Sequence, residues 1–256
     1  LRVVDELEER YAEFPGLNLT FEVREGILKH CSAANARKLG ELGERFLQRL
    51  QPGLEAQLAN LADEVAYNNH DVDDGIRAGL ITIEDLCGCR MFGRQFEFVR
   101  GQYPQLGGRR LVHEVVRRMI DYTVNDLVDA SRASLASAAP RSVDEVRSLA
   151  QPLLLFSDGV REEHLELKRY LREHLYKHFR VLRMTTKAQR VVRELFNAMF
   201  GEVNLMPTEH QEAARKLEAM DGEAGRARAV ADYIAGMTDR FAILEHRRLF
   251  NPAERT

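Results

Sequence analysis

Apolar residues recur with helical spacing along almost the whole chain. The clearest pattern runs from residue 109 to residue 137, where apolar side chains return every third or fourth position and define one buried stripe: Leu111, Val112, Val115, Val116, Met119, Ile120, Val124, Leu127 and Val128. No segment alternates with period two for long enough to predict a sheet. We therefore expect an all-α protein with about nine helices.

The other predicted helices have the same periodicity and are bounded by glycine and proline. They span residues 1–13, 21–30, 54–78, 93–102, 160–178, 187–200, 209–220 and 226–250. Ser142 and Thr208 each stand three residues before Glu or Gln, which predicts a capping box at both helix starts. Leu1 already lies in an amphipathic helical pattern, so we expect further sequence upstream of it.

Composition narrows the possible partners and the compartment. Hydrophobic residues make up 45% and charged residues 30%, and the net charge of −3 provides no electrostatic footprint for nucleic acid. No stretch is apolar for the 18 or so residues of a membrane span. Cys31, Cys87 and Cys89 form no even disulfide framework. We expect a cytoplasmic protein with neither a membrane nor a nucleic-acid partner.

The segment from Leu54 to Ala78 contains the candidate chemistry. At about 100° per residue, one side of this helix is a predicted core face, composed of Leu58, Leu61, Ala62, Val65, Val72 and Ile76. Asp63, Tyr67 and Asp71 line up on the opposite side at i, i+4 and i+8. Two carboxylates therefore lie about 12 Å apart along the axis with a tyrosine between them.

A polar stripe opposite an apolar one is also what any solvated surface helix shows. Two features of this segment favour a site instead. Six of the eight residues from Tyr67 to Asp74 are polar, and none of the eight is lysine or arginine. Like charges crowded without an i, i+4 counter-charge are locally costly, and such crowding is typical of a cation site.

Three segments carry a family resemblance: Asn18–His30, Leu61–Gly75 and Asp232–Asp239. They resemble the bacterial deoxyguanosine triphosphate triphosphohydrolases of the HD superfamily, and the chain resembles the C-terminal two-thirds of such a protein. The resemblance implies a multi-helix HD fold that cleaves a deoxynucleoside triphosphate to deoxynucleoside and triphosphate. It also implies a divalent metal (magnesium or manganese, with iron and nickel as alternatives) and a homo-oligomer, a hexamer or another even assembly.

Residue roles follow only from this resemblance. Asp63 matches a metal ligand, Tyr67 the tyrosine that packs against the deoxyribose and crowds out a 2′-hydroxyl, and Asp71 the acid that accepts from the 3′-hydroxyl. Lys168 and Tyr176, eight positions apart on one predicted helix, resemble a phosphate contact and a nucleotide contact. The family's metal histidines and its candidate catalytic His and Glu have no match here, so we expect no catalytic residue in this chain.

Two other pairs of residues that contain histidine are alternative metal-ligand candidates. His70-Asp71 resembles a metal-binding His-Asp pair, but it lies inside the acidic segment, so we do not assign His70 as a ligand. His174 and His178 stand at a spacing that suits zinc, although polar surface histidines are the more common case.

The leading interpretation is metal-dependent hydrolysis of dGTP, or of dNTPs generally. Residues 1–140 would be the C-terminal portion of the HD core, and residues 141–256 a helical region that completes the nucleotide site. Two alternatives stay open. One is a catalytically silent module that binds nucleotide or assembles with a partner, and the other is an HD phosphohydrolase acting on another nucleotide.

Overall fold

The computed structural model describes residues 1–254, and within this range the regular structure is helical. No strand occurs between residues 1 and 254, where β-pairing is limited to one isolated bridge between Glu9 and Gly16. The predicted all-α class is confirmed. The chain divides into two compact units, Leu1–Leu175 and Tyr176–Thr256.

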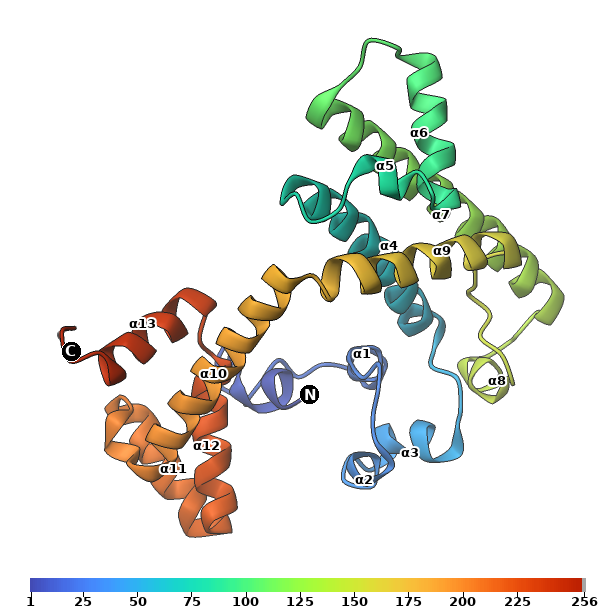
Figure 1. Cartoon of the computed structure of the whole chain (residues 1–256). Helices are drawn as coiled ribbons and strands as arrows, with labels where there is room; N and C mark the ends of the chain where they lie inside the picture. Colours follow the sequence, from blue (N-terminus) through green and yellow to red (C-terminus); the bar gives the residue numbers. More distant parts are fainter. Residues whose placement is uncertain (255–256) are drawn as a thin grey trace. The chain divides into compact units, whose positions relative to one another are not determined.

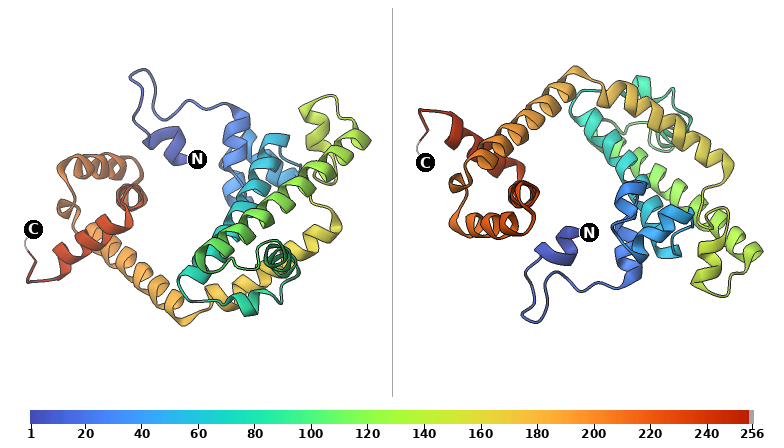
Figure 2. Two further views of the ribbon diagram at one scale, coloured as in Figure 1. Left: turned by 90° about the horizontal axis from the view of Figure 1, so that it is seen from above. Right: turned by 90° about the horizontal axis from the view of Figure 1, so that it is seen from below.

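The first unit contains nine α-helices and two π-helical turns, η1 (Val3–Leu7) and η2 (Arg172–Tyr176), the second of which ends just past the unit boundary. The α-helices are α1 (Phe21–Ile27), α2 (Ala33–Ala36), α3 (Glu41–Gln48), α4 (Leu54–Arg77), α5 (Ile83–Leu86), α6 (Arg90–Gln102), α7 (Gly108–Ala138), α8 (Val143–Ser148) and α9 (Asp158–Leu171). Helices α4 and α6 both pack against α7, and α9 contacts α4 and α6 (Figures 1 and 2).

The core of the first unit lies where these helices meet. Its fully buried side chains include Val72, Phe92, Val115, Met119 and Leu167. The stripe predicted on α7 is only partly buried: Val115 and Met119 are fully buried, whereas Val124 and Val128 are exposed. Periodicity alone predicts one continuous stripe, but the neighbouring helices cover only part of it.

A buried ion cluster ties α1 to the start of α4. The Glu25 carboxylate is 3% exposed; it accepts from the Gly53 backbone N–H at 3.2 Å and lies 3.3 Å from the Arg147 guanidinium. Arg45 lies 3.9 Å away on the other carboxylate oxygen. Because a buried charge is costly unless it is paired, this cluster fixes α1, and with it the residues that follow α1, against α4.

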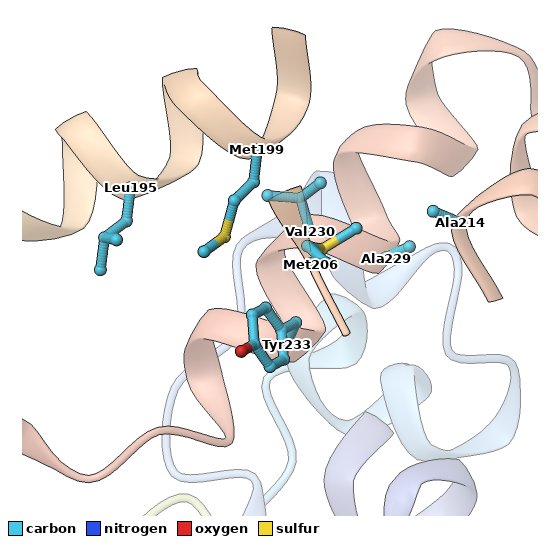
Figure 3. Close-up of a cluster of buried hydrophobic side chains, with 7 residues drawn as sticks. All are labelled: Leu195, Met199, Met206, Ala214, Ala229, Val230 and Tyr233. Atoms are coloured by element: carbon cyan, nitrogen blue, oxygen red, sulfur yellow. The ribbon is translucent and has the colours of Figure 1, made fainter. Parts of the chain in front are cut away.

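The second unit contains α10 (Phe179–Gly201), the short 3₁₀ helix η3 (Val203–Leu205), α11 (Thr208–Asp221), α12 (Glu223–Ala235) and α13 (Asp239–Phe250). Figure 3 shows its core, in which Leu195 and Met199 of α10 point toward the side chains of α12. Gly222 adopts a positive φ of 62° between α11 and α12. Gly225 allows close packing there, because an added Cβ would lie 2.0 Å from the Leu217 carbonyl oxygen.

Several predicted boundaries were wrong. The helix expected over residues 1–13 is only the turn η1, and the one expected over 226–250 breaks into α12 and α13 at Gly236. The helix expected over 160–178 ends as an α-helix at Leu171, whereas α10 begins at Phe179 instead of residue 187. The Ser142 cap is confirmed, since its side chain accepts from the Glu145 N–H. The Thr208 cap is wrong, because Pro207 precedes α11 without a side-chain cap.

Candidate functional site

Helix α4 supports the three candidate residues on a face that stays outside the core. The Asp63 side chain is 65% exposed, Tyr67 is 57% exposed, and Asp71 is half-buried. The core face of this helix differs from the prediction. Val65 and Val72 are buried as expected, but Leu58 and Ala62 are exposed, and the remaining buried positions are Ala56, Gln57, Asn68, Asn69 and Gly75.

The exposed apolar residues of α4 line a groove against α7. It has a volume of about 420 Å³ and includes Leu58, Ala62, Ile120 and Val124 in its walls. His70 also borders it, next in sequence to Asp71. The predicted core residues Leu58 and Ala62 therefore face this groove and not the packed interior.

Asp63 already has a cationic neighbour. The Lys29 ammonium lies 2.6 Å from Asp63 Oδ2, and Lys29 follows directly on the segment that the Glu25 cluster fixes. Within residues 1–254, no three or more His, Cys, Asp or Glu side chains are grouped so as to hold a metal ion. A single carboxylate beside an ammonium does not form a divalent-metal site, so the described residues do not fit a metal by themselves.

Lys168 is held against the same helix from α9. Its ammonium lies 2.8 Å from Glu64 Oε1, and the lysine side chain remains 55% exposed. Glu64 follows Asp63 in sequence and points about 100° away from it around α4. The contact between α4 and α9 thus places a cation beside the residue that follows Asp63.

A buried polar junction lies one turn earlier on α9. His164 Nε2 is 2.8 Å from the Asn68 side-chain amide and 3.4 Å from Glu64 Oε1. Its ring stacks on Phe156 with centroids 5.4 Å apart. The role of Nε2 depends on the tautomer of the ring: without a proton it accepts from the Asn68 side-chain N–H, and with a proton it donates to the Glu64 carboxylate.

The electrostatics of this junction keep Glu64 ionised. The hydrogen bond with His164, helped by the Lys168 ammonium, lowers the pKa of Glu64 to about 2 even though partial burial opposes the shift. A carboxylate that is ionised at neutral pH binds the Lys168 ammonium here by a charge-assisted hydrogen bond.

Sequence reasoning did not select Lys29, Glu64, Asn68 or His164. For two of them a signal was available. His164 lies on the buried stripe of α9 with Val160, Leu167 and Leu171, and Asn68 lies between Val65 and Val72 on α4. A polar side chain inside a buried stripe needs a hydrogen-bond partner, and this marks it for attention.

The residues after α9 depart from the expected regular helix. A π-helical turn replaces the last part of it, so the simple i, i+8 alignment of Lys168 with Tyr176 does not apply. Tyr176 is half-buried and is the first residue of the second unit. His174 stacks on Tyr170, and the His178 ring accepts from the Arg180 N–H to cap α10, so these contacts favour structural roles for both histidines.

A match to a protein-family model indicates the broad class of protein to which this chain is similar. Residues 154–248 match the phosphohydrolase-associated domain, a stretch that contains α9 to α12 and most of α13. The chain is therefore related to phosphohydrolases.

Curated relatives narrow this further. The chain is 60% identical to the deoxyguanosinetriphosphate triphosphohydrolase-like protein of Bordetella pertussis over 98% of its own length. The corresponding protein of Thiobacillus denitrificans is 57% identical over 98% of this chain. The chain spans 63% and 64% of these two relatives. It is a homologue of the deoxyguanosinetriphosphate triphosphohydrolase-like proteins, which confirms the resemblance first noted in three short segments.

Proposed function

We propose that this chain is part of a hydrolase that converts dGTP, or dNTPs more broadly, to deoxynucleoside and triphosphate, and that it contributes the sugar- and phosphate-binding side of the site. One observation carries the proposal. The exposed face of α4 presents Asp63, Tyr67 and Asp71 in line, and Lys168 is held against that helix by Glu64.

The sugar end of the site is formed by Tyr67 and Asp71. The Tyr67 ring, more than half exposed, offers a flat surface against which a deoxyribose packs and a 2′-hydroxyl is crowded out. Asp71, one turn further along α4, accepts a hydrogen bond from the 3′-hydroxyl. A substrate hydroxyl recognised by a carboxylate is strongly selected, because its loss leaves the charged group without that bond.

The phosphate end is formed by the lysines. Lys168 and Lys29 each pair with a carboxylate of α4, Glu64 and Asp63 respectively. An incoming triphosphate replaces these carboxylates as the anionic partner of the ammonium groups, so neither lysine loses its counter-charge when substrate binds. Tyr176 provides a further nucleotide contact in this proposal.

The metal would bind at Asp63 with ligands from outside this chain. We propose magnesium or manganese, with iron and nickel as alternatives, since the described residues supply one carboxylate only. Such an ion would offset charge on the phosphates and would activate water for attack. The chain alone would therefore hydrolyse no dGTP, and the complete protein would act as an even homo-oligomer in the cytoplasm.

A catalytically silent nucleotide-binding module is the second candidate. The Lys29–Asp63 ion pair favours it, because it satisfies Asp63 without a metal.

Equilibrium binding of dGTP and GTP to the purified chain tests the shared part of both candidates. We expect preference for dGTP, weakened about tenfold or more by Asp71→Ala. The matched control Asp74→Ala changes an exposed carboxylate of the same helix and leaves affinity unchanged. Equal loss of dGTP affinity in the two variants, or equal affinity of the unsubstituted chain for GTP and dGTP, would contradict the assignment of Tyr67 and Asp71 as the sugar site.

A further inference from the structure

The groove between α4 and α7 is apolar along almost its whole length. Every fourth residue of each helix contributes to its walls, in the order Leu58, Ala62 and Ala66 on α4 and Ile120, Val124 and Val128 on α7. At 1.5 Å per residue, each wall extends over roughly 17 Å up to His70 and Ser131, which are the only polar side chains among the described residues that line it. We refer to this feature as the α4–α7 groove.

The α4–α7 groove is open to solvent. Leu58, Val124 and Val128 are 50%, 43% and 40% exposed, while Val65 and Leu127 in its lining are buried. Exposed apolar side chains that stand singly on a surface are ordinary, but a continuous row of them on two packed helices is typical of an interaction site. The groove is therefore a surface that lacks its partner.

A helix is the occupant that this groove fits. The walls are α-helices whose backbone groups are paired within each helix, so they offer no hydrogen bonds to an extended peptide. A third helix satisfies its own backbone and can bury apolar residues at i, i+3, i+4 and i+7 between the two walls. Its diameter of about 10 Å covers both rims, whereas an acyl chain in an open groove would leave one side in water.

The complete protein contains further chain that can supply such a helix. This chain spans only 63% and 64% of the two relatives described above, so more than a third of each relative lies outside the matched region. A segment of the same polypeptide reaches the groove at a high effective concentration. It would therefore occupy the groove ahead of a second copy or a free ligand.

We propose that the α4–α7 groove is the docking site of an amphipathic helix from the portion of the complete protein that lies outside these 256 residues. Ala62 and Ala66 of the groove directly precede Asp63 and Tyr67, which point about 100° further round α4. The docked helix runs beside the candidate site and forms one of its walls. The inference rests on the shape and apolarity of the groove and does not depend on the proposed hydrolysis.

Alkylation of introduced cysteines tests whether the groove is covered in the complete protein. Val124→Cys and Ala66→Cys each place one thiol on a wall, and Ala133→Cys places a control thiol on the exposed opposite side of α7. Mass spectrometry follows the rate at each site in the complete protein and in this chain. We expect the two groove sites to react about tenfold or more slowly in the complete protein, and residue 133 to react equally in both.

A photocrosslink identifies the occupant. With p-benzoylphenylalanine at the exposed rim position Leu58, illumination of the complete protein should join residue 58 to a peptide from outside these 256 residues. Circular dichroism of each variant confirms that the helices are retained.

Four results would overturn the proposal. They are equal alkylation of the groove sites in the two proteins, equal slowing at residue 133, a crosslink only to peptides of these 256 residues, and oleate that protects the groove sites of this chain as fully as the complete protein does. The crosslink result would assign the groove to a second copy or another part of this chain, and the oleate result to an acyl chain. None of these measurements involves dGTP hydrolysis, so the proposed function stands or fails separately.

Discussion

His164→Ala probes the buried junction between α4 and α9. The imidazole is 3% exposed and contacts the Asn68 amide at 2.8 Å. Its removal leaves that buried amide without its partner, at a cost of about 1–3 kcal/mol. Loss of the stack on Phe156 adds about 0.5–1.5 kcal/mol. We expect the free energy of unfolding of the first unit to fall by about 1.5–4.5 kcal/mol.

The assay is urea denaturation followed by far-ultraviolet circular dichroism, with hydrogen exchange to locate the effect. Faster exchange should be confined to peptides of α4 and α9, because the junction joins these two helices. His30→Ala is the control, since His30 is exposed and should change stability by less than about 0.5 kcal/mol. Equal destabilisation by the two substitutions, or unchanged exchange in α4, would refute the junction as described.

Three further predictions concern other parts of the chain. Glu25→Ala should lower the free energy of unfolding by about 3–5 kcal/mol, because it leaves Arg45 and Arg147 without their buried counter-charge. Glu22→Ala, on the exposed side of α1, should lower it little. Similar thermal midpoints for the two variants would contradict this prediction. Burial raises the pKa of the Cys89 thiol to about 11, so in the native chain Cys89 should be alkylated more slowly than Cys31. The alkylation rate of Cys89 should rise as the pH approaches that value. Mass spectrometry that finds Cys89 modified before Cys31 at neutral pH would refute this prediction. In the complete protein, Asp71→Ala should lower kcat/KM for dGTP about ten- to a hundredfold, and Tyr67→Ala should raise the ratio of GTP to dGTP turnover; steady-state kinetics that show neither change would remove the sugar assignment.

Helical periodicity predicted α4 and α7 well, but it placed the start of the long helix α10 eight residues too late. The segments containing α4 and α7 were placed to within about two residues, a precision normal for helix ends. Periodicity did not predict the break between α12 and α13, which single residues determine. Gly236 ends α12, and Thr238 caps the start of α13 by accepting from the Phe241 N–H. The short helices α2, α3 and α5 were missed, and of α8 only the start at Ser142 was predicted, because fewer than three turns carry too little pattern.

Only the part of the candidate site that lies within a single helix could be predicted from the sequence. The alignment of Asp63, Tyr67 and Asp71 follows from spacing within α4. The Lys29–Asp63 pair joins residues 34 positions apart, and the Lys168–Glu64 pair joins residues 104 apart. Such contacts depend on tertiary packing, which the spacing within single helices does not determine.

The same limit explains the error on the core face of α4. Hydrophobicity assigned Leu58 and Ala62 to the core, but the interior of this helix includes Asn68 and Asn69, each 2% exposed. Asn68 is satisfied by His164 of α9, and the Asn69 amide donates to the Val65 carbonyl. Buried amides with such partners are tolerated in a core, and hydrophobicity alone does not locate them.

Product analysis of the complete protein tests the central claim most directly. Dilute dGTP is incubated with the protein and a divalent metal, and the products are identified by phosphorus NMR. We expect deoxyguanosine and intact triphosphate to appear together, and we expect Asp63→Ala to abolish both products and bound metal while Asp74→Ala retains them. Release of phosphate or pyrophosphate, or full activity and metal content in Asp63→Ala, would contradict the account.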